Sequence, residues 1–405
     1  MDAERIRCEL TESLDEGIDR GIFPGGVASL TIGGEPPVVV ARGSIGRGEH
    51  TSLPSADTIY DLASLTKVIV TLPLVLLSMQ TGKLSLSDPL EIHLPEWERT
   101  ADARKRRITL LHLLTHTSGL PAWRPYYLLG HGRDDYLSLI AAEPLIGEPG
   151  KQVIYSDPGF MLLGFLLERV WDEPLELLAE RLIFQPMGMT ATGYRPLARG
   201  VDIRKIAPTE DGNAYEREQS RQQAEQMMAA GHPHAGQLQE RLDSFAWREG
   251  MIRGTVHDGN CHYGLDGVSG HAGLFSTARD VERYMRMWTS ADTPVRLDPV
   301  LRTFAAGCRT GRLAPARALG WEASAAAGPL EAASAGCTGG DLLSPDAFGH
   351  TGFTGTSIWC DPIRGATLIV LTNRVHPAVS PLMPRWRKTF HNRVMSLVSG
   401  PARTS

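Results

Sequence analysis

Segments with the composition of β-strands occur near both ends of the chain, and this arrangement restricts the fold more than any other feature. Val27–Ile32 and Val38–Ala41 precede a long region with helical patterns, and Ser357–Asp361 and Ala366–Thr372 follow it. A short turn containing glycine and proline separates the two segments of each pair, as in an antiparallel hairpin. The sequence therefore predicts an α+β fold, in which one antiparallel sheet is built from both chain ends.

Two predicted domains follow from this order. Residues 1–63 and 290–405 are expected to form the sheet domain, and residues 64–289 a large, inserted and mainly helical domain. Terminal helices are expected to flank the sheet, at residues 2–20 and 384–398. The first of them has apolar residues at a spacing of four, which places them on one helical face: Ile6, Leu10, Leu14 and Ile18.

Residues 212–250 differ in composition from the rest of the helical region. Residues 215–226 form a polar helix with little apolar face, and Gly231 and Pro233 interrupt it before a second helix at 237–247. We interpret the segment as an insertion that serves as a lid, a partner surface or a mobile element. His232 and His234 within it are predicted to face solvent.

The overall charge and the cysteine pattern exclude several classes of protein. The chain has 405 residues, a formal net charge of −5 and 42% hydrophobic residues, values typical of a globular protein without a nucleic-acid partner. Five scattered cysteines include no Cys-x-x-Cys pair, which indicates a reducing compartment. The charged N-terminus lacks an apolar signal region, and the longest apolar run is judged too short and interrupted to span a bilayer. A cytoplasmic location is therefore predicted; the oligomeric state is left open.

The segment from Asp61 to Lys67 precedes that longest apolar run and contains a potential nucleophile. Ser64 and Lys67 are three residues apart, so on a helix they share a face. The helix N-terminus favours negative charge, and a lysine amine in the first turn can accept a proton from the hydroxyl. Apolar neighbours should desolvate the amine and lower its pKa. The alternative is a capping serine followed by a surface lysine; Pro73, inside the predicted helix, has no explanation at this stage.

Histidine pairs and clusters offer a second, weaker kind of site. His112 and His116 have the spacing of two metal ligands on one helical face, but no acidic residue lies between them, and capping and packing are the favoured explanation. A second group has irregular spacing, and no metal or other cofactor is predicted for it: His257, Asp258, His262 and His271.

Two further motifs complete a constellation with Ser64-x-x-Lys67. They are Tyr155-Ser156-Asp157 and His350-Thr351-Gly352. The three motifs and their separations resemble those of the serine β-lactamase and penicillin-binding protein superfamily, in the branch with class C β-lactamases, D-Ala-D-Ala carboxypeptidases and β-lactamase-like esterases. The resemblance covers roughly residues 20–395, apart from the 212–250 insertion.

The resemblance implies a role for each motif residue. Ser64 would be the acylated nucleophile, Lys67 would lower the barrier to removing its proton, and Tyr155 would shuttle a proton to the leaving group. The backbone N–H groups of Ser64 and Phe353 would form an oxyanion hole. His350, Thr351 and Gly352 would line the cleft, together with Asp157.

Two departures from the family pattern bear on the substrate. Asp157 replaces the asparagine that is usual in family β-lactamases and adds negative charge, which argues against β-lactam turnover. His350 stands where many β-lactamases have lysine, whereas esterases and some D-Ala peptidases share histidine. We therefore expect a serine hydrolase acting through an acyl-enzyme on a small ester, amide or peptide-like substrate, first of all a carboxylesterase. The alternatives are a D-Ala-D-Ala carboxypeptidase, a weak class C-like β-lactamase, and a non-catalytic scaffold or sensor.

Overall fold

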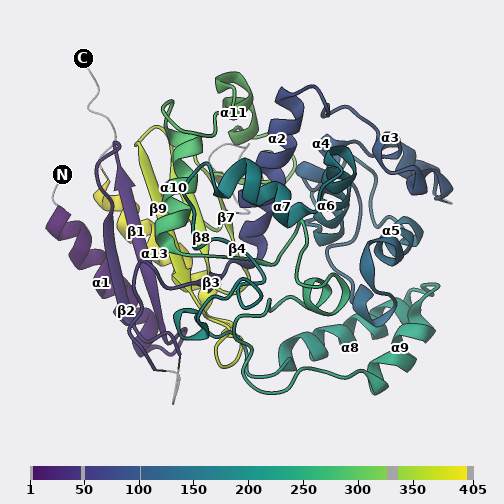
Figure 1. Ribbon diagram of the computed structural model, residues 1–405, viewed down its shortest axis with the longest axis horizontal. Coiled ribbons are helices and arrows are strands. Elements are labelled where there is room, and N and C mark those ends of the chain that lie inside the picture. Colours follow the sequence, from purple (N-terminus) through teal and green to yellow (C-terminus); the bar gives the residue numbers. More distant parts are fainter. Residues whose placement is uncertain (1–2, 47–50, 101, 326–335, 399–405) are drawn as a thin grey trace.

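A six-stranded antiparallel sheet forms the left half of the molecule in Figure 1, and its two N-terminal strands lie together at one edge, beside four strands from the C-terminal part of the chain. The computed structural model describes residues 3–46, 51–100, 102–325 and 336–398. The strand order is β2-β1-β9-β8-β7-β6. The strands are β1 (Gly25–Ile32), β2 (Val38–Gly43), β6 (Glu322–Ala323), β7 (Phe348–Thr351), β8 (Ser357–Asp361) and β9 (Ala366–Thr372).

The pairing of β1 with β9 joins the two ends of the chain. Val27 lies opposite Leu371 and Ser29 opposite Ile369, in an antiparallel register that runs from Gly26 to Ile32. All residues of β9 are buried, as expected of a central strand with a helical layer on each face. The predicted α+β class, with a sheet from both termini, is confirmed.

Helices α1 (Ala3–Asp19) and α13 (Met383–Leu397) cover one face of this sheet (Figure 1). Leu10 and Leu14 of α1 are fully buried there, as their spacing of four predicts. The Trp386 indole of α13 packs edge-on against Phe23 and donates a hydrogen bond to the Ser13 carbonyl at 3.1 Å. The two terminal helices are thereby tied to each other as well as to the sheet.

The helical region covers the other face and extends to the right in Figure 1. Its main core is continuous with the sheet, because Val27 and Ile369 belong to the same apolar cluster as Val68 and Phe160. Helix α10 (Ala278–Thr289), inside the predicted helical domain, packs on β1 and β9. The remaining elements are α2 (Leu72–Gln80), α3 (Leu90–His93), η4 (Pro95–Arg99), η5 (Ala103–Arg107), α4 (Leu110–Leu114), η6 (Tyr126–Leu128), α5 (Gly132–Ala142), α6 (Asp157–Trp171), α7 (Leu175–Ala179), η7 (Glu180–Phe184), η8 (Ile203–Lys205), η9 (Asn260–Gly264) and α11 (Pro299–Ala306).

A second, three-stranded sheet, not expected from the sequence, lies beside the site described below. Its order is β3 (Tyr60–Asp61), β5 (Leu274–Ser276) and β4 (Gly193–Tyr194). The strands have two or three residues each, too few for an alternating pattern to reveal them.

The helical stretch Ala63–Gln80 changes its geometry twice. It starts as a 3₁₀ turn, η2 (Ala63–Leu65), continues as a π-helical turn, η3 (Lys67–Thr71), and becomes α-helical only at Leu72. Pro73 therefore stands in the first turn of α2, where its missing N–H costs little. By length and hydropathy this stretch could cross a membrane, contrary to expectation, but 78% of it is buried inside the protein.

The insertion forms two helices, α8 (Ala214–Ala229) and α9 (Ala235–Ser244), at the lower edge of Figure 1. Leu238 and Ala224 join the buried cluster that holds this pair against η6. The prediction that His232 faces solvent is wrong: its side chain is 6% exposed and lies 3.4 Å from the Glu143 carboxylate. The reason is that Glu143, itself buried and paired with Arg124, draws the turn between α8 and α9 onto the helical region.

Candidate active site

Ser64 stands on a tight turn that its neighbour Asp61 holds in place. The Asp61 carboxylate accepts hydrogen bonds from the Ala63 N–H at 2.9 Å and the His257 N–H at 2.7 Å. Ala63 has a φ of +46°, a backbone conformation that costs an L-residue about 1–2 kcal/mol. The turn presents Ser64 at the start of η2, and sequence reasoning assigned Asp61 no part in this.

Lys67 is fully buried directly beneath the serine. Its Nζ lies 3.0 Å from Ser64 Oγ, 3.1 Å from the His271 carbonyl and 2.7 Å from Asp157 Oδ1. Burial alone would lower the pKa of Lys67, but the negative charge of the nearby Asp157 carboxylate outweighs it and raises that pKa above its ordinary value. The expected lowering is thus reversed, because the carboxylate replaces the amide of the family motif.

Tyr155 also lies beside the Lys67 amine. Lys67 Nζ is 4.9 Å from the centre of the Tyr155 ring, which also packs against His116 and His350. Burial raises the pKa of the Tyr155 phenol more than Lys67 lowers it, so the phenol keeps its proton at neutral pH. Its hydroxyl is buried and makes no hydrogen bond of regular geometry among the residues described. The resting pair is therefore an ammonium and a neutral phenol.

The turn after β7 is fixed directly above the nucleophile. Thr354 Oγ1 donates to the Asp61 carbonyl at 2.6 Å, and Thr356 Oγ1 donates to the Leu62 carbonyl at 3.2 Å. A Cβ on Gly352 would lie 2.4 Å from the Leu62 oxygen, so only glycine permits this approach.

Two backbone donors remain free beside this turn. In the described part of the chain, neither the Ser64 N–H nor the Phe353 N–H donates a hydrogen bond. These are the two groups expected to hold an oxyanion, and such a donor contributes about 3–4 kcal/mol to transition-state stabilisation. Serine, amine, phenol and donors together can carry out acyl transfer.

The comparisons with known proteins agree with this geometry. The family model described as Beta-lactamase matches residues 10–390. The chain belongs to the β-lactamase family. A protein of Escherichia coli (strain K12) described as a "Putative D-alanyl-D-alanine carboxypeptidase" is 31% identical over 342 residues, which are 80% of this chain and 71% of that protein.

Solved structures show the same fold at lower identity. EstCE1, a hydrolase with promiscuous acyltransferase activity, superposes with a TM-score of 0.68 at 20% identity, over 97% of this chain and 99% of that one. A class C β-lactamase from Rhodobacter sphaeroides gives a TM-score of 0.67 at 20% identity, over 96% and 98%. The protein is thus a serine hydrolase of the β-lactamase fold.

The active-site cavity of this β-lactamase-family chain has a volume of about 400 Å³ and is lined by charged groups of both signs. The acidic groups include the carboxyl groups of Asp157, Asp258 and Glu216, and the cationic groups include the guanidinium groups of Arg317 and Arg387, which together we call the arginine wall. The cavity includes Ser64 and Tyr155, and the other site residues predicted from the sequence that line it are His350, Thr351, Gly352 and Phe353.

Neither arginine was singled out by sequence reasoning. Arg317 is 8% exposed and Arg387 6% exposed, and each has a buried Nε–H without a hydrogen-bond partner. Within the described residues no carboxylate forms an ion pair with either guanidinium, and Glu322, which also lines the cavity, instead accepts hydrogen bonds from Thr338. An arginine outside any motif looks like a surface residue in the sequence, so nothing there predicts this burial.

His350 contributes no charge to the arginine wall. Burial, and then the positive charges of Arg317 and Lys67, hold the pKa of His350 well below its ordinary value, so the ring is neutral. Its Nδ1 lies 2.8 Å from the Thr351 carbonyl, which fixes the proton on that nitrogen and leaves Nε2 unpartnered. The cationic character of this end comes from the arginines.

The insertion also reaches the site, which the sequence left undecided. Tyr215, Glu216 and Gln219 of α8 line the cavity, and the Tyr215 ring is 5.1 Å from that of Phe353. The insertion is therefore a fixed part of the cavity wall in this structure.

Three further histidines have structural hydrogen-bond partners. His271 Nε2 lies 3.0 Å from Asp258 and His257 Nε2 lies 2.9 Å from Glu210, while His116 Nδ1 accepts the Ser156 N–H. One ligand atom each of Asp157, Asp258 and His271 lie within 4.8 Å of one another, as metal ligands could. The Lys67 ammonium already lies 2.7 Å from Asp157 there, so we assign this group to the lysine.

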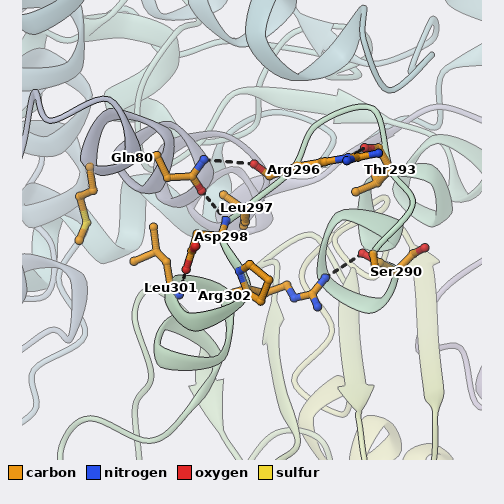
Figure 2. A pocket seen from close by; sticks show the side chains of 11 residues that line it. Gln80, Ser290, Thr293, Arg296, Leu297, Asp298, Leu301 and Arg302 are labelled. Carbon is orange, nitrogen blue, oxygen red and sulfur yellow. Dashed lines mark hydrogen bonds between the residues drawn. The ribbon is translucent and has the colours of Figure 1, made fainter.

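A larger cavity, of about 790 Å³, lies elsewhere, between the end of α2 and α11 (Figure 2). Its polar groups are already paired: Gln80 bridges the Arg296 carbonyl and the Asp298 N–H, and Arg302 donates to the Ser290 carbonyl. Size therefore does not identify the active site in this protein; the contacts around Ser64 do.

Proposed function

We propose that this serine hydrolase is a carboxypeptidase of the D-alanyl-D-alanine type, which removes a C-terminal amino acid that carries a free carboxylate. The observation that supports it is the pair of buried arginines without carboxylate partners, Arg317 and Arg387, beside the nucleophile. A buried unpaired charge is costly, and an incoming carboxylate would offset that cost through charge-assisted hydrogen bonds. The name of the Escherichia coli relative agrees with this choice.

The position of Tyr155 supports a role of the arginine wall in binding the leaving group. The Tyr155 ring packs against His350, and the Arg317 guanidinium carbon lies 5.4 Å from the ring centre. A phenol that protonates the leaving nitrogen must be next to it, so the carboxylate of the departing amino acid would lie near Arg317.

The contacts of Lys67 suggest the order of proton transfers. Once Lys67 has lost its proton at alkaline pH, the neutral amine accepts the proton of Ser64 Oγ as that oxygen bonds to the scissile carbonyl carbon. The carbon–nitrogen bond breaks, and Tyr155 gives its proton to the departing amine and is reprotonated by Lys67. Water then attacks the acyl-enzyme, the ester bond to Ser64 breaks, and the proton of water returns to the serine by the same route.

A carboxylesterase, ranked first from the sequence, is the second candidate. The neutral His350 ring favours it, because a site without charge at that position suits an ester that has no carboxylate. Asp157 still argues against a β-lactamase, since it keeps a carboxylate at the lysine. A non-catalytic scaffold would have no need for an amine 3.0 Å from the serine.

The deciding experiment compares substrates that differ only in the terminal charge. We expect hydrolysis of an acyl-D-Ala-D-Ala peptide to exceed that of its C-terminal amide by at least tenfold in kcat/KM, and Arg317→Gln to abolish this preference. Arg302→Gln, distant from Ser64 and in the second cavity, is the matched control. Fast turnover of p-nitrophenyl esters without cleavage of either peptide would support the esterase instead.

Covalent labelling separates an enzyme from a scaffold. A fluorophosphonate probe should label the wild-type protein and fail to label Ser64→Ala. Labelling of neither protein would contradict every hydrolase proposal made here. The cytoplasmic location stays a prediction.

A further inference from the structure

Arg374, which lies outside every motif of the sequence, holds the turn that carries the Phe353 N–H. Arg374 follows β9 and lines the active-site cavity. Its Nε donates a hydrogen bond to the Phe353 carbonyl at 2.6 Å, and its Nη1 donates to the Ser380 carbonyl at 2.9 Å. Among the residues that the structure describes, no other donor reaches the Phe353 carbonyl. The side chain therefore ties this turn to the loop that follows β9.

The same side chain contacts the turn at two further points. The Arg374 guanidinium carbon lies 4.3 Å from the centre of the Phe353 ring, as in a cation–π contact. A Cβ on Gly355 would lie 2.8 Å from Arg374 Cγ, so the aliphatic part of the side chain lies directly against Gly355. Arg374 thus contacts the turn on both sides of Thr354.

The direction of the Phe353 N–H depends on how this turn is built. The N–H shares a peptide plane with the Gly352 carbonyl, which accepts the Gly355 N–H at 3.1 Å. The two groups point in opposite directions across a trans peptide, so a contact that fixes the carbonyl also fixes the N–H. Gly352 and Gly355 have no side chains to restrict their own backbone. The N–H is therefore held in place by groups outside the turn that contact Phe353 and Gly355.

Arg374 differs from the other neighbours of Phe353 in reaching its backbone. His257 and Tyr215 pack on the Phe353 ring, at 5.7 and 5.1 Å between ring centres. Within the described part of the chain only Arg374 contacts the ring and also donates to the carbonyl. A planar guanidinium directs its donors along fixed lines, which a lysine ammonium does not reproduce.

We propose that Arg374 is a positioning residue for the oxyanion hole, which keeps the Phe353 N–H directed at the carbonyl oxygen of the bound substrate. The inference rests on acyl transfer at Ser64, which the carboxypeptidase and esterase proposals share. Oxyanion donors act on the transition state, so loss of Arg374 should lower the maximal rate and leave the affinity for the substrate unchanged.

The test measures the reaction of a fluorophosphonate probe with Ser64, which requires no knowledge of the natural substrate. Ser64 Oγ bonds to phosphorus, fluoride leaves, and the phosphonyl oxygen takes the place of the oxyanion. For Arg374→Ala we expect the maximal labelling rate to fall by about 30-fold, and the probe concentration that gives half this rate to change by less than about twofold. Arg374→Lys keeps the charge and the contact with Gly355 but loses the planar fork, and its rate should fall by about tenfold.

Arg309→Ala is the matched control. Arg309 Nε donates to the Phe304 carbonyl at 2.8 Å, and its guanidinium carbon lies 3.8 Å from the centre of the Phe304 ring. This is the same pair of contacts on a residue that does not line the active-site cavity, so the variant should be labelled at the wild-type rate. Thermal unfolding curves establish that each variant is folded at the assay temperature.

Hydrolysis separates positioning from substrate binding. Arg374→Ala should lower kcat by the same factor for an acyl-D-Ala-D-Ala peptide, for its C-terminal amide and for a p-nitrophenyl ester. A loss confined to the free acid would show that Arg374 binds the carboxylate and would overturn the inference. Wild-type labelling rates in both Arg374 variants, or an equal loss in Arg309→Ala, would overturn it too. If the wild-type enzyme cleaves the ester and neither peptide, the carboxypeptidase proposal fails, whereas the labelling rates still decide the role of Arg374.

Discussion

At the scale of single residues, the Asp157–Lys67 contact controls the charge of the site. Replacing the carboxylate by an amide in Asp157→Asn removes the main influence that raises the pKa of Lys67, and burial then lowers it. The neutral amine should become available at lower pH, so the alkaline rise of kcat/KM should shift toward neutrality. A pH–rate profile measures the shift; an unchanged midpoint would show that Lys67 does not set the rate.

Asp61 offers a prediction about stability at the same scale. Asp61→Ala leaves two buried N–H groups, those of Ala63 and His257, without an acceptor. Each costs about 1–3 kcal/mol, so we expect the free energy of unfolding to fall by about 2–6 kcal/mol. Asp57→Ala, whose carboxylate is 63% exposed and pairs with Arg279, should change it by less than about 0.5 kcal/mol. Chemical denaturation of both variants measures the two changes. Equal losses in the free energy of unfolding would contradict the role given to Asp61.

At the scale of elements, patterns within short stretches of sequence correctly predicted a helix and two strand pairs. The spacing of Leu10 and Leu14 predicted α1, and the strand-like composition and the turns predicted the pairs β1–β2 and β8–β9, because each signal lies within a few residues. The motifs singled out Ser64, Lys67 and Tyr155 through a family resemblance. The arginine wall and the approach of α8 escaped prediction, since both depend on contacts between residues far apart in the chain.

The insertion should owe its place to its small apolar cluster. Leu238 is fully buried there, so Leu238→Ala should lower stability by about 2–5 kcal/mol and speed hydrogen exchange across α8 and α9. Met228→Ala, on α8 and 54% exposed, is the control that should change neither. If hydrogen exchange became faster throughout the protein and not only in these helices, the insertion would not unfold independently of the rest.

At the scale of the whole molecule, the sheet and the helical region share one apolar core. Val27 and Ile369 from the sheet contact the same cluster as Val68 and Phe160 from the helical region. We therefore expect one cooperative unfolding transition, with coincident curves from calorimetry and from tryptophan fluorescence. Two resolved transitions would mean that the predicted domains 1–63 plus 290–405 and 64–289 unfold independently.

The burial of Lys67 at the base of a fully packed helix has a consequence for how this protein can change. Ser64 and Lys67 cannot be altered without disturbing the molecule's interior, whereas α8 lies at its lower edge (Figure 1). New substrates would then arise through exchange of this helix around an unchanged catalytic pair. Replacing the α8–α9 hairpin with a different one is accordingly the most direct way to change which substrate the protein accepts.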